Sequence, residues 1–195
     1  MRSLRRRIMM NKKYELLEYV ENPNGGYIDM GIYGDQNLDF SIKVDFRNVQ
    51  AFAFGSRRRL GTAVPDSSYA FLCQERNMPR FDSGTLFNRF SSDTTKPIEA
   101  TKTGCNIVIA GLKCSLSIAN VTTPKHLIMF GIDNYYDDIK IIYDIKIYYL
   151  TFSRDGKLLR DFIPVRRRSD GKVGLLDRVE NKFYTSPNGA EFVGG

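Results

Sequence analysis

The amino-acid sequence predicts an all-β protein with the architecture of an antiparallel two-sheet β-sandwich of the jelly-roll type. Several segments alternate apolar and polar residues with a period of two, the pattern of a strand with one buried and one solvated face. Residue pairs that favour tight turns separate these segments. We find no three-turn segment with apolar residues at helical spacing and with helix start and stop signals.

Three segments show the alternation most clearly. Residues 40–46 carry apolar side chains on one face and polar side chains on the other. In residues 112–119 the face expected to be buried consists of Leu112, Cys114, Leu116 and Ile118. Residues 139–149 keep apolar side chains at six alternate positions, so the longest strand or a strand pair is expected there.

Turn signals lie between these segments. Asp-Gly and Asn-Gly pairs supply the positive φ that short hairpin connections need. Turns are therefore expected at residues 22–26, 82–84, 155–156, 170–171 and 187–189.

The length of 195 residues fits one sizeable domain. With 42% hydrophobic and 26% charged residues the chain has enough apolar material for a core, which excludes overall disorder. The longest apolar runs contain 6 residues, against roughly 20 for a membrane-spanning helix. The sequence thus predicts a folded domain at residues 14–195, without a membrane partner.

The net charge of +7 is concentrated at the N-terminus. Residues 1–13 contain six basic side chains and no acid, whereas residues 14–195 are close to neutral. Because nucleic-acid-binding domains usually spread basic residues over a folded face, a nucleic-acid partner is not expected. A basic arm that docks on a partner is one interpretation and a frayed terminus is the other. The docking residues would be Arg2, Leu4, Arg5, Arg6, Arg7, Ile8 and Met9.

Cysteine and histidine are scarce. Three cysteines and a single histidine, His126, leave no zinc-binding pattern, so no metal site of that kind and no cofactor are expected. Reduced thiols are the expectation, although Cys105 and Cys114 could pair if strands bring them close enough.

Both ends of the domain resemble a known family. Residues 17–31 and 146–164, followed by Gly174-Leu175-Leu176-Asp177 and Phe183-Tyr184, resemble concanavalin A-like, laminin-G-like domains of gut bacteria and their phages. The resemblance implies a jelly roll whose first and last segments lie side by side. It also implies a hairpin turn at Asp155-Gly156, with a return strand that ends at Pro164. The matching residues are best explained as core and turn positions.

The arm adds a second resemblance, because three arginines followed by an apolar residue and two methionines look like the start of many phage structural proteins. Together the two resemblances suggest a virion component that is assembled in the cytoplasm of a bacterial host. Its partners would be other virion structural proteins in an oligomeric assembly, together with a host-surface glycan as an open alternative. This inference is by analogy of fold and context.

One segment is a candidate for ligand binding. Asp133, Asn134, Tyr135, Tyr136, Asp137 and Asp138 combine carboxylate and amide oxygens, which could ligate Ca²⁺, with rings that could stack on a sugar. The alternative is a solvated hairpin connection. Catalysis is not expected, because the spaced carboxylates of glycoside hydrolases are missing and His126 has no identifiable nucleophile or orienting acid.

Two further arginine triplets are candidate anion contacts: Arg57, Arg58 and Arg59, and Arg166, Arg167 and Arg168. Each is expected at a turn, where it could meet an anionic partner. Alternatively, these arginines are exposed and balanced by acids such as Asp45, Asp66 and Asp170. The sequence as a whole favours a non-enzymatic virion protein, with a carbohydrate-binding or adhesion module as the alternative and a glycan-cleaving enzyme third.

Overall fold

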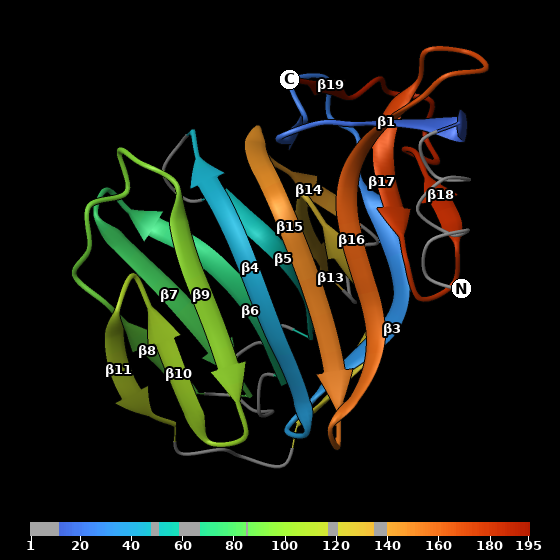
Figure 1. Cartoon of the computed structure of the whole chain (residues 1–195). Helices are drawn as coiled ribbons and strands as arrows, with labels where there is room; N and C mark the ends of the chain where they lie inside the picture. The colour runs from blue at the N-terminus through green and yellow to red at the C-terminus, as the bar shows by residue number, and fades with distance from the viewer. Residues whose placement is uncertain (1–11, 48–50, 59–66, 85, 117–120, 135–139) are drawn as a thin grey trace.

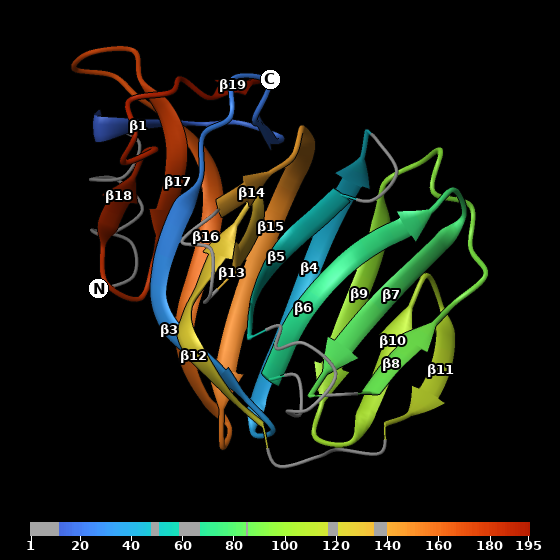
Figure 2. The ribbon, with the colours of Figure 1, turned by 180° about the vertical axis from the view of Figure 1, so that it is seen from behind.

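Two β-sheets pack face to face in the computed structural model, which describes residues 12–47, 51–58, 67–84, 86–116, 121–134 and 140–195. The described residues form 19 strands (Figure 1 and Figure 2). The predicted all-β sandwich is therefore confirmed. No helix among the described residues is both long enough and apolar enough to span a membrane.

The larger sheet, sheet A, contains eleven strands. Eight strands follow the order β11-β10-β9-β4-β15-β16-β17-β18. Of the other three, β1 pairs with β16, β2 pairs with β15, and β19 pairs with β2. The bounds are β1 Tyr14–Leu16, β2 Val20–Glu21, β4 Leu38–Phe46, β9 Ile98–Thr103, β10 Asn106–Ile109, β11 Leu112–Ser115, β15 Ile145–Arg154, β16 Lys157–Arg167, β17 Val173–Asp177, β18 Lys182–Tyr184 and β19 Val193–Gly194.

The smaller sheet, sheet B, contains eight strands. Its path is β14-β13-β5-β6-β7-β8, and β12 joins β3 to β5. All its pairs are antiparallel except β13 with β5. The bounds are β3 Ile28–Asp35, β5 Ala51–Arg58, β6 Ser67–Glu75, β7 Met78–Ser83, β8 Leu86–Arg89, β12 Thr122–Met129, β13 Gly131–Asn134 and β14 Lys140–Ile142.

Strand β4 follows the predicted alternation throughout. Its odd-numbered positions from Asp39 to Asp45 are half-exposed, and its even-numbered positions from Leu38 to Phe46 are buried. Because side chains of a strand point alternately to its two faces, this pattern directs one face of β4 into the core and the other to solvent.

The prediction for residues 112–118 is wrong in its first half. Leu112 is 47% exposed and Cys114 is half-buried, whereas Leu116 is buried. Strand β11 is the outermost strand of sheet A, so the other sheet covers it only partly. Ile118 lies outside the described residues.

The long run at residues 139–149 divides between the two sheets. Strand β14 belongs to sheet B and β15 to sheet A, so these neighbouring strands do not pair with each other. A bulge interrupts the pairing of β15 with β4 after Ile147. As a result Tyr149 is half-exposed and Leu150 takes the inward position, which shifts the predicted alternation by one residue.

The terminal segments pair as expected. Val193 of β19 lies opposite Glu21 of β2, and the Gly195 carbonyl accepts a hydrogen bond from the Tyr19 amide at 3.1 Å. Asp155 and Gly156 form the predicted hairpin turn with φ of 52° and 76°.

Pro164, however, does not end its strand, because β16 continues to Arg167. Pairing with β15 stops at Phe162 and pairing with β1 starts at Val165. Between them the Pro164 carbonyl accepts a hydrogen bond from the Leu17 amide at 3.1 Å. Pro164 thus lies where the partner of β16 changes from β15 to β1. A proline is tolerated there because no continuous strand pairing on that side needs its missing N–H.

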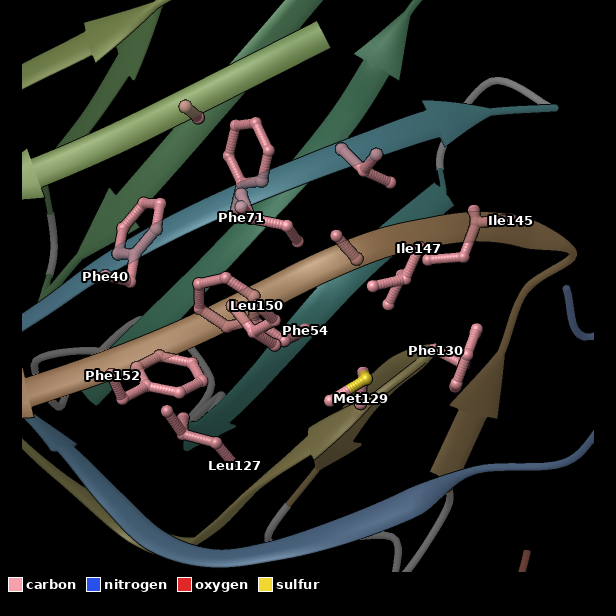
Figure 3. Packing of buried hydrophobic residues seen from close by; sticks show 14 of the residues in the cluster. Phe40, Phe54, Phe71, Leu127, Met129, Phe130, Ile145, Ile147, Leu150 and Phe152 are labelled. Atoms are coloured by element: carbon pink, nitrogen blue, oxygen red, sulfur yellow. The ribbon is translucent and has the colours of Figure 1, made fainter. Parts of the chain in front are cut away.

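Aromatic side chains fill the space between the sheets. The Phe40 ring lies 5.1 Å from the Phe54 ring and 5.9 Å from the Phe71 ring, so β4 of sheet A contacts β5 and β6 of sheet B. Figure 3 shows these rings with Phe152 in the same layer. Burying side chains of this size contributes most of the stability of a sandwich of these dimensions.

A buried ammonium group lies at one margin of this core. Lys102 is almost completely buried, and its Nζ donates to the carbonyls of Leu38 at 2.8 Å and Gln36 at 3.1 Å. Asp39 lies 3.3 Å away and provides the opposite charge. Burial lowers the pKa of Lys102, and the nearby carboxylate partly opposes this effect.

A second polar network joins β16 to β3 and to the end of β17. The Arg160 guanidinium donates to the Met30 carbonyl at 3.0 Å and contacts Glu180 at 2.8 Å and buried Asp177 at 3.6 Å. Glu180 in turn accepts a hydrogen bond from the Tyr184 hydroxyl. Arg160 thereby ties β16 to β3 and to the segment after β17, which agrees with a structural role for these residues.

Candidate functional site

The base of the basic arm is fixed to the end of β16. The Lys13 carbonyl accepts a hydrogen bond from the Arg168 amide at 2.9 Å. One residue further on, the Tyr14 ring packs 5.6 Å from the Phe183 ring. Glu15 then forms an ion pair with Arg166 at 3.0 Å. The chain that enters the sandwich at residue 14 is thus held by a backbone bond, a ring contact and an ion pair.

The connection after β16 is a tight turn beside this base. The Arg167 amide donates to the Lys172 carbonyl at 2.8 Å, and the Gly171 amide donates to the Arg167 carbonyl at 2.8 Å. The Arg167 side chain lies over the Phe183 ring and binds Asp170 at 2.6 Å. This hydrogen bond lowers the pKa of Asp170 to about 2. The turn is therefore cross-linked through its own side chains.

The predicted docking residues of the arm lie outside the described residues. Of residues 1–13, the structure describes only Lys12 and Lys13, both exposed. The docking interpretation of Arg2, Leu4, Arg5, Arg6, Arg7, Ile8 and Met9 therefore remains a prediction.

The described strand residues of the two arginine triplets lie in different sheets. Arg57 and Arg58 belong to β5 rather than to a turn, and Arg59 lies outside the described residues. Arg166 and Arg167 belong to β16, so that in the second triplet only Arg168 lies in a turn as expected. Strand β5 runs toward the end of the sandwich at which β16 starts, whereas Arg166–Arg168 follow at the opposite end (Figure 1 and Figure 2). Arg166 and Arg167 are balanced by acids, as the alternative interpretation proposed for such arginines.

A hollow of about 240 Å³ opens next to the turn after β16. It is lined by buried Phe192 and half-buried Val173, together with exposed polar residues. These are Asp170, Lys172, Thr185 and Glu191. The hollow thus lies at the same end of the sandwich as the base of the arm.

The predicted ligand loop begins with buried residues. Asp133 and Asn134 are only 6% exposed, because they form the end of β13 and pair with Ser56 and Arg57 of β5. Asp133 also lies 3.4 Å from the Lys125 ammonium. The expectation of a solvent-facing loop is therefore wrong for these two residues. Tyr135, Tyr136, Asp137 and Asp138 lie outside the described residues.

The outer face of sheet A presents a row of hydroxyl groups. The strand register places Thr101 of β9 opposite Ser41 of β4, and Ser41 opposite Thr151 of β15. Lys43, Glu99 and Tyr149 form the adjacent row. In the described part of the chain, none of the three hydroxyls hydrogen-bonds to another protein group. Figure 1 shows no described element crossing the front of these strands.

His126 has an acid partner on the neighbouring strand. Its Nδ1 lies 3.2 Å from Asp29, and its ring packs edge-on against Tyr33 at 4.6 Å. Sequence reasoning did not identify Asp29, because the pairing of β12 with β3 brings together residues 97 positions apart. A nucleophile for this pair is not identified.

The cysteines remain unpaired. Cys105 lies opposite Leu116 at the end of the β10–β11 hairpin, and Cys114 lies opposite Ile107. The two cysteines are therefore diagonal neighbours, and diagonal side chains in such a pair are farther apart than a disulfide allows. Both are free thiols. Among the described residues, no group of three or more His, Cys, Asp or Glu side chains is arranged to hold a metal ion.

Two comparisons with known proteins find no relative. The chain matches no protein-family model, and a search of curated proteins finds no significant match. The functional interpretation therefore depends on the residues and their arrangement.

The arm base and the hydroxyl row are features that sequence reasoning missed. The Asp170-Gly171 turn signal indicated a tight connection, but not that Arg168 would bond to Lys13. No sequence signal aligns Ser41, Thr101 and Thr151, because strand register is set by pairing between distant segments.

Proposed function

We propose that this protein is a non-enzymatic structural component of a phage virion that docks through its N-terminal arm and displays the sandwich outward. The observation that carries the proposal is the uneven charge, six basic residues in the first 13 and a nearly neutral remainder. An arm of this kind suits charge-assisted contacts with another protein.

The closure of the sandwich supports the same arrangement. Strands β1, β2 and β19 bring the start and the end of the domain together at one end of sheet A. The arm joins the domain there, at Lys13. A partner that binds the arm would thus hold one end of the sandwich and leave the β15–β16 hairpin pointing away from it.

Incorporation into particles tests the proposal. Wild type and the variant Arg5→Gln/Arg6→Gln/Arg7→Gln are expressed in the bacterial host during phage production, and purified particles are analysed by mass spectrometry. The variant should be depleted from particles several-fold, while a matched variant at Lys96, Lys113 and Lys157, each changed to Gln, should be incorporated normally. Undiminished incorporation of the arm variant would contradict the proposal.

The open face of sheet A favours a carbohydrate-binding module as the second candidate. Ser41, Thr101 and Thr151 offer donors and acceptors that the described protein groups do not use, and Tyr149 beside them offers a ring face. Hydroxyl groups and an adjacent aromatic ring are the groups that hydrogen-bond to a sugar and stack on it.

A glycan array with and without calcium distinguishes the two possible sugar sites. Binding that is lost in Tyr149→Ala and Thr151→Val would assign the site to the sheet face. Binding that is lost in Tyr135→Ala and Asp137→Ala would assign it to the predicted loop. Absence of binding under all conditions would leave the structural role alone.

A further inference from the structure

Four exposed basic residues lie on the two segments that meet where the arm joins the sandwich. Lys12 and Lys13 precede β1, and Arg168 and Lys172 belong to the turn after β16. The bond between the Arg168 amide and the Lys13 carbonyl brings these two segments together. We refer to Lys12, Lys13, Arg168 and Lys172 as the basic base.

The charges of the basic base are available for a partner. In the described part of the chain, none of these four cationic groups has a carboxylate within ion-pair distance. Asp170 interacts electrostatically with Lys172, but the two groups form no ion pair. Their neighbours differ in this respect, because Arg166 binds Glu15 and Arg167 binds Asp170. The arginine triplet therefore divides into two neutralised members and one free member, Arg168.

The backbone that carries the basic base is also held in place. The turn that carries Arg168 and Lys172 is closed by two backbone hydrogen bonds and by the Arg167–Asp170 ion pair. The segment that carries Lys13 is followed by the Tyr14–Phe183 ring contact. Because this backbone is already ordered, binding a partner costs only the ordering of the exposed basic side chains.

The surroundings indicate the class of partner. Asp170, Lys172 and Glu191 all line the hollow. The Asp170 charge is already paired with Arg167, whereas the exposed Glu191 carboxylate forms no ion pair within the described part of the chain. A nucleic-acid backbone, negative throughout, would meet the Glu191 carboxylate at close range. A protein surface can carry groups of both signs, with acids opposite the basic base and a hydrogen-bond donor opposite Glu191.

We propose that the basic base and the adjacent hollow form a preformed docking surface for an acidic protein surface. The inference rests on the proposed function, since it identifies a second, folded part of the same docking site. The partner would place a carboxylate between Lys172 and Arg168, and one of its side chains would enter the hollow.

The experiment is a fluorescence-polarisation titration of the full chain with a labelled oligo-glutamate peptide at low ionic strength. The test variant is Arg168→Glu/Lys172→Glu. The matched control is Lys113→Glu/Lys157→Glu, which makes the same change in net charge at exposed positions in β11 and at the start of β16. Thermal melts establish that both variants fold.

The test variant should bind the peptide about tenfold more weakly than wild type, the size expected for reversing two exposed charges in a cluster. The control should change the affinity by about twofold or less, because charges beyond a Debye length of ~10 Å are screened. Equal losses in both variants would overturn the docking surface. A loss of the same size with duplex DNA as with the peptide would overturn the assignment to an acidic protein.

The two proposals fail separately. If the arm variant enters particles normally, the proposed function is wrong, whatever the titration shows. If the arm variant is excluded from particles while the two double variants bind the peptide equally, the proposed function stands and the basic base has no part in docking.

Discussion

The outer faces of the two sheets differ in their exposure to solvent. On sheet A the outward positions of the central strands carry Ser41, Thr101 and Thr151, which contact solvent. On sheet B the outward positions of β5, β6 and β13 form a second apolar cluster, separate from the main core. It consists of Phe52, Ala70, Leu72 and Ile132, all buried, with Tyr143 packed against them.

The difference shows why alternation finds some strands and not others. A strand with one wet face must alternate, as β4 does. A strand that is covered on both faces can be apolar at every position. Strand β6 is such a strand, because its residues from Tyr69 to Cys73 are five consecutive buried residues. Period-two analysis therefore found strands of sheet A and overlooked the central strand of sheet B.

The largest expected effect compares the two outer faces directly. Leu72→Ala should lower the free energy of unfolding by about 2–5 kcal/mol, because Leu72 is only 3% exposed and its removal leaves a cavity. Thr101→Ala, on the outer face of sheet A, should change it by about 0.5 kcal/mol or less. Urea denaturation measures both. Similar values for the two variants would show that the outer faces do not differ in this way.

A smaller effect concerns the inner face of sheet A, where Lys102 is buried. Lys102→Met should cost about 1–2 kcal/mol at neutral pH, because the Gln36 carbonyl and Asp39 lose their donor. Since burial lowers the pKa of Lys102, the unfolded state binds more protons in the alkaline range below the ordinary lysine pKa. The stability of wild type relative to the variant should therefore increase as pH rises through that range. A difference that stays constant with pH would contradict this assignment.

The smallest effect is expected at the exposed end of sheet A. The Arg167–Asp170 pair holds the pKa of Asp170 at about 2, below its ordinary value. Its contribution is therefore present above the ordinary carboxyl pKa and is lost as pH falls toward 2. Asp170→Asn should reduce the melting temperature slightly at neutral pH, and wild type and variant should converge in acid. A constant gap down to pH 2 would show that the ion pair is not its source.

Particular residues show how far sequence reasoning reached into the candidate site. The basic arm and the turn at Asp170-Gly171 were predictable, because charge and turn chemistry are local signals. Asp133 and Asn134 were misinterpreted as a solvated loop, since nothing local shows that β13 would lie beside β5. The division of residues 139–149 between two sheets was missed for the same reason.

The sequence by itself determined that this chain forms an all-β domain with a strongly basic start. Side-chain alternation and positive-φ turn pairs act within a few residues and can be recognised without neighbours. Only the tertiary structure decided which charges remain free at the arm base, which hydroxyls align across sheet A and which polar groups are buried. These properties depend on register and packing between segments far apart in the chain, where a shift of one residue turns every side chain to the opposite face.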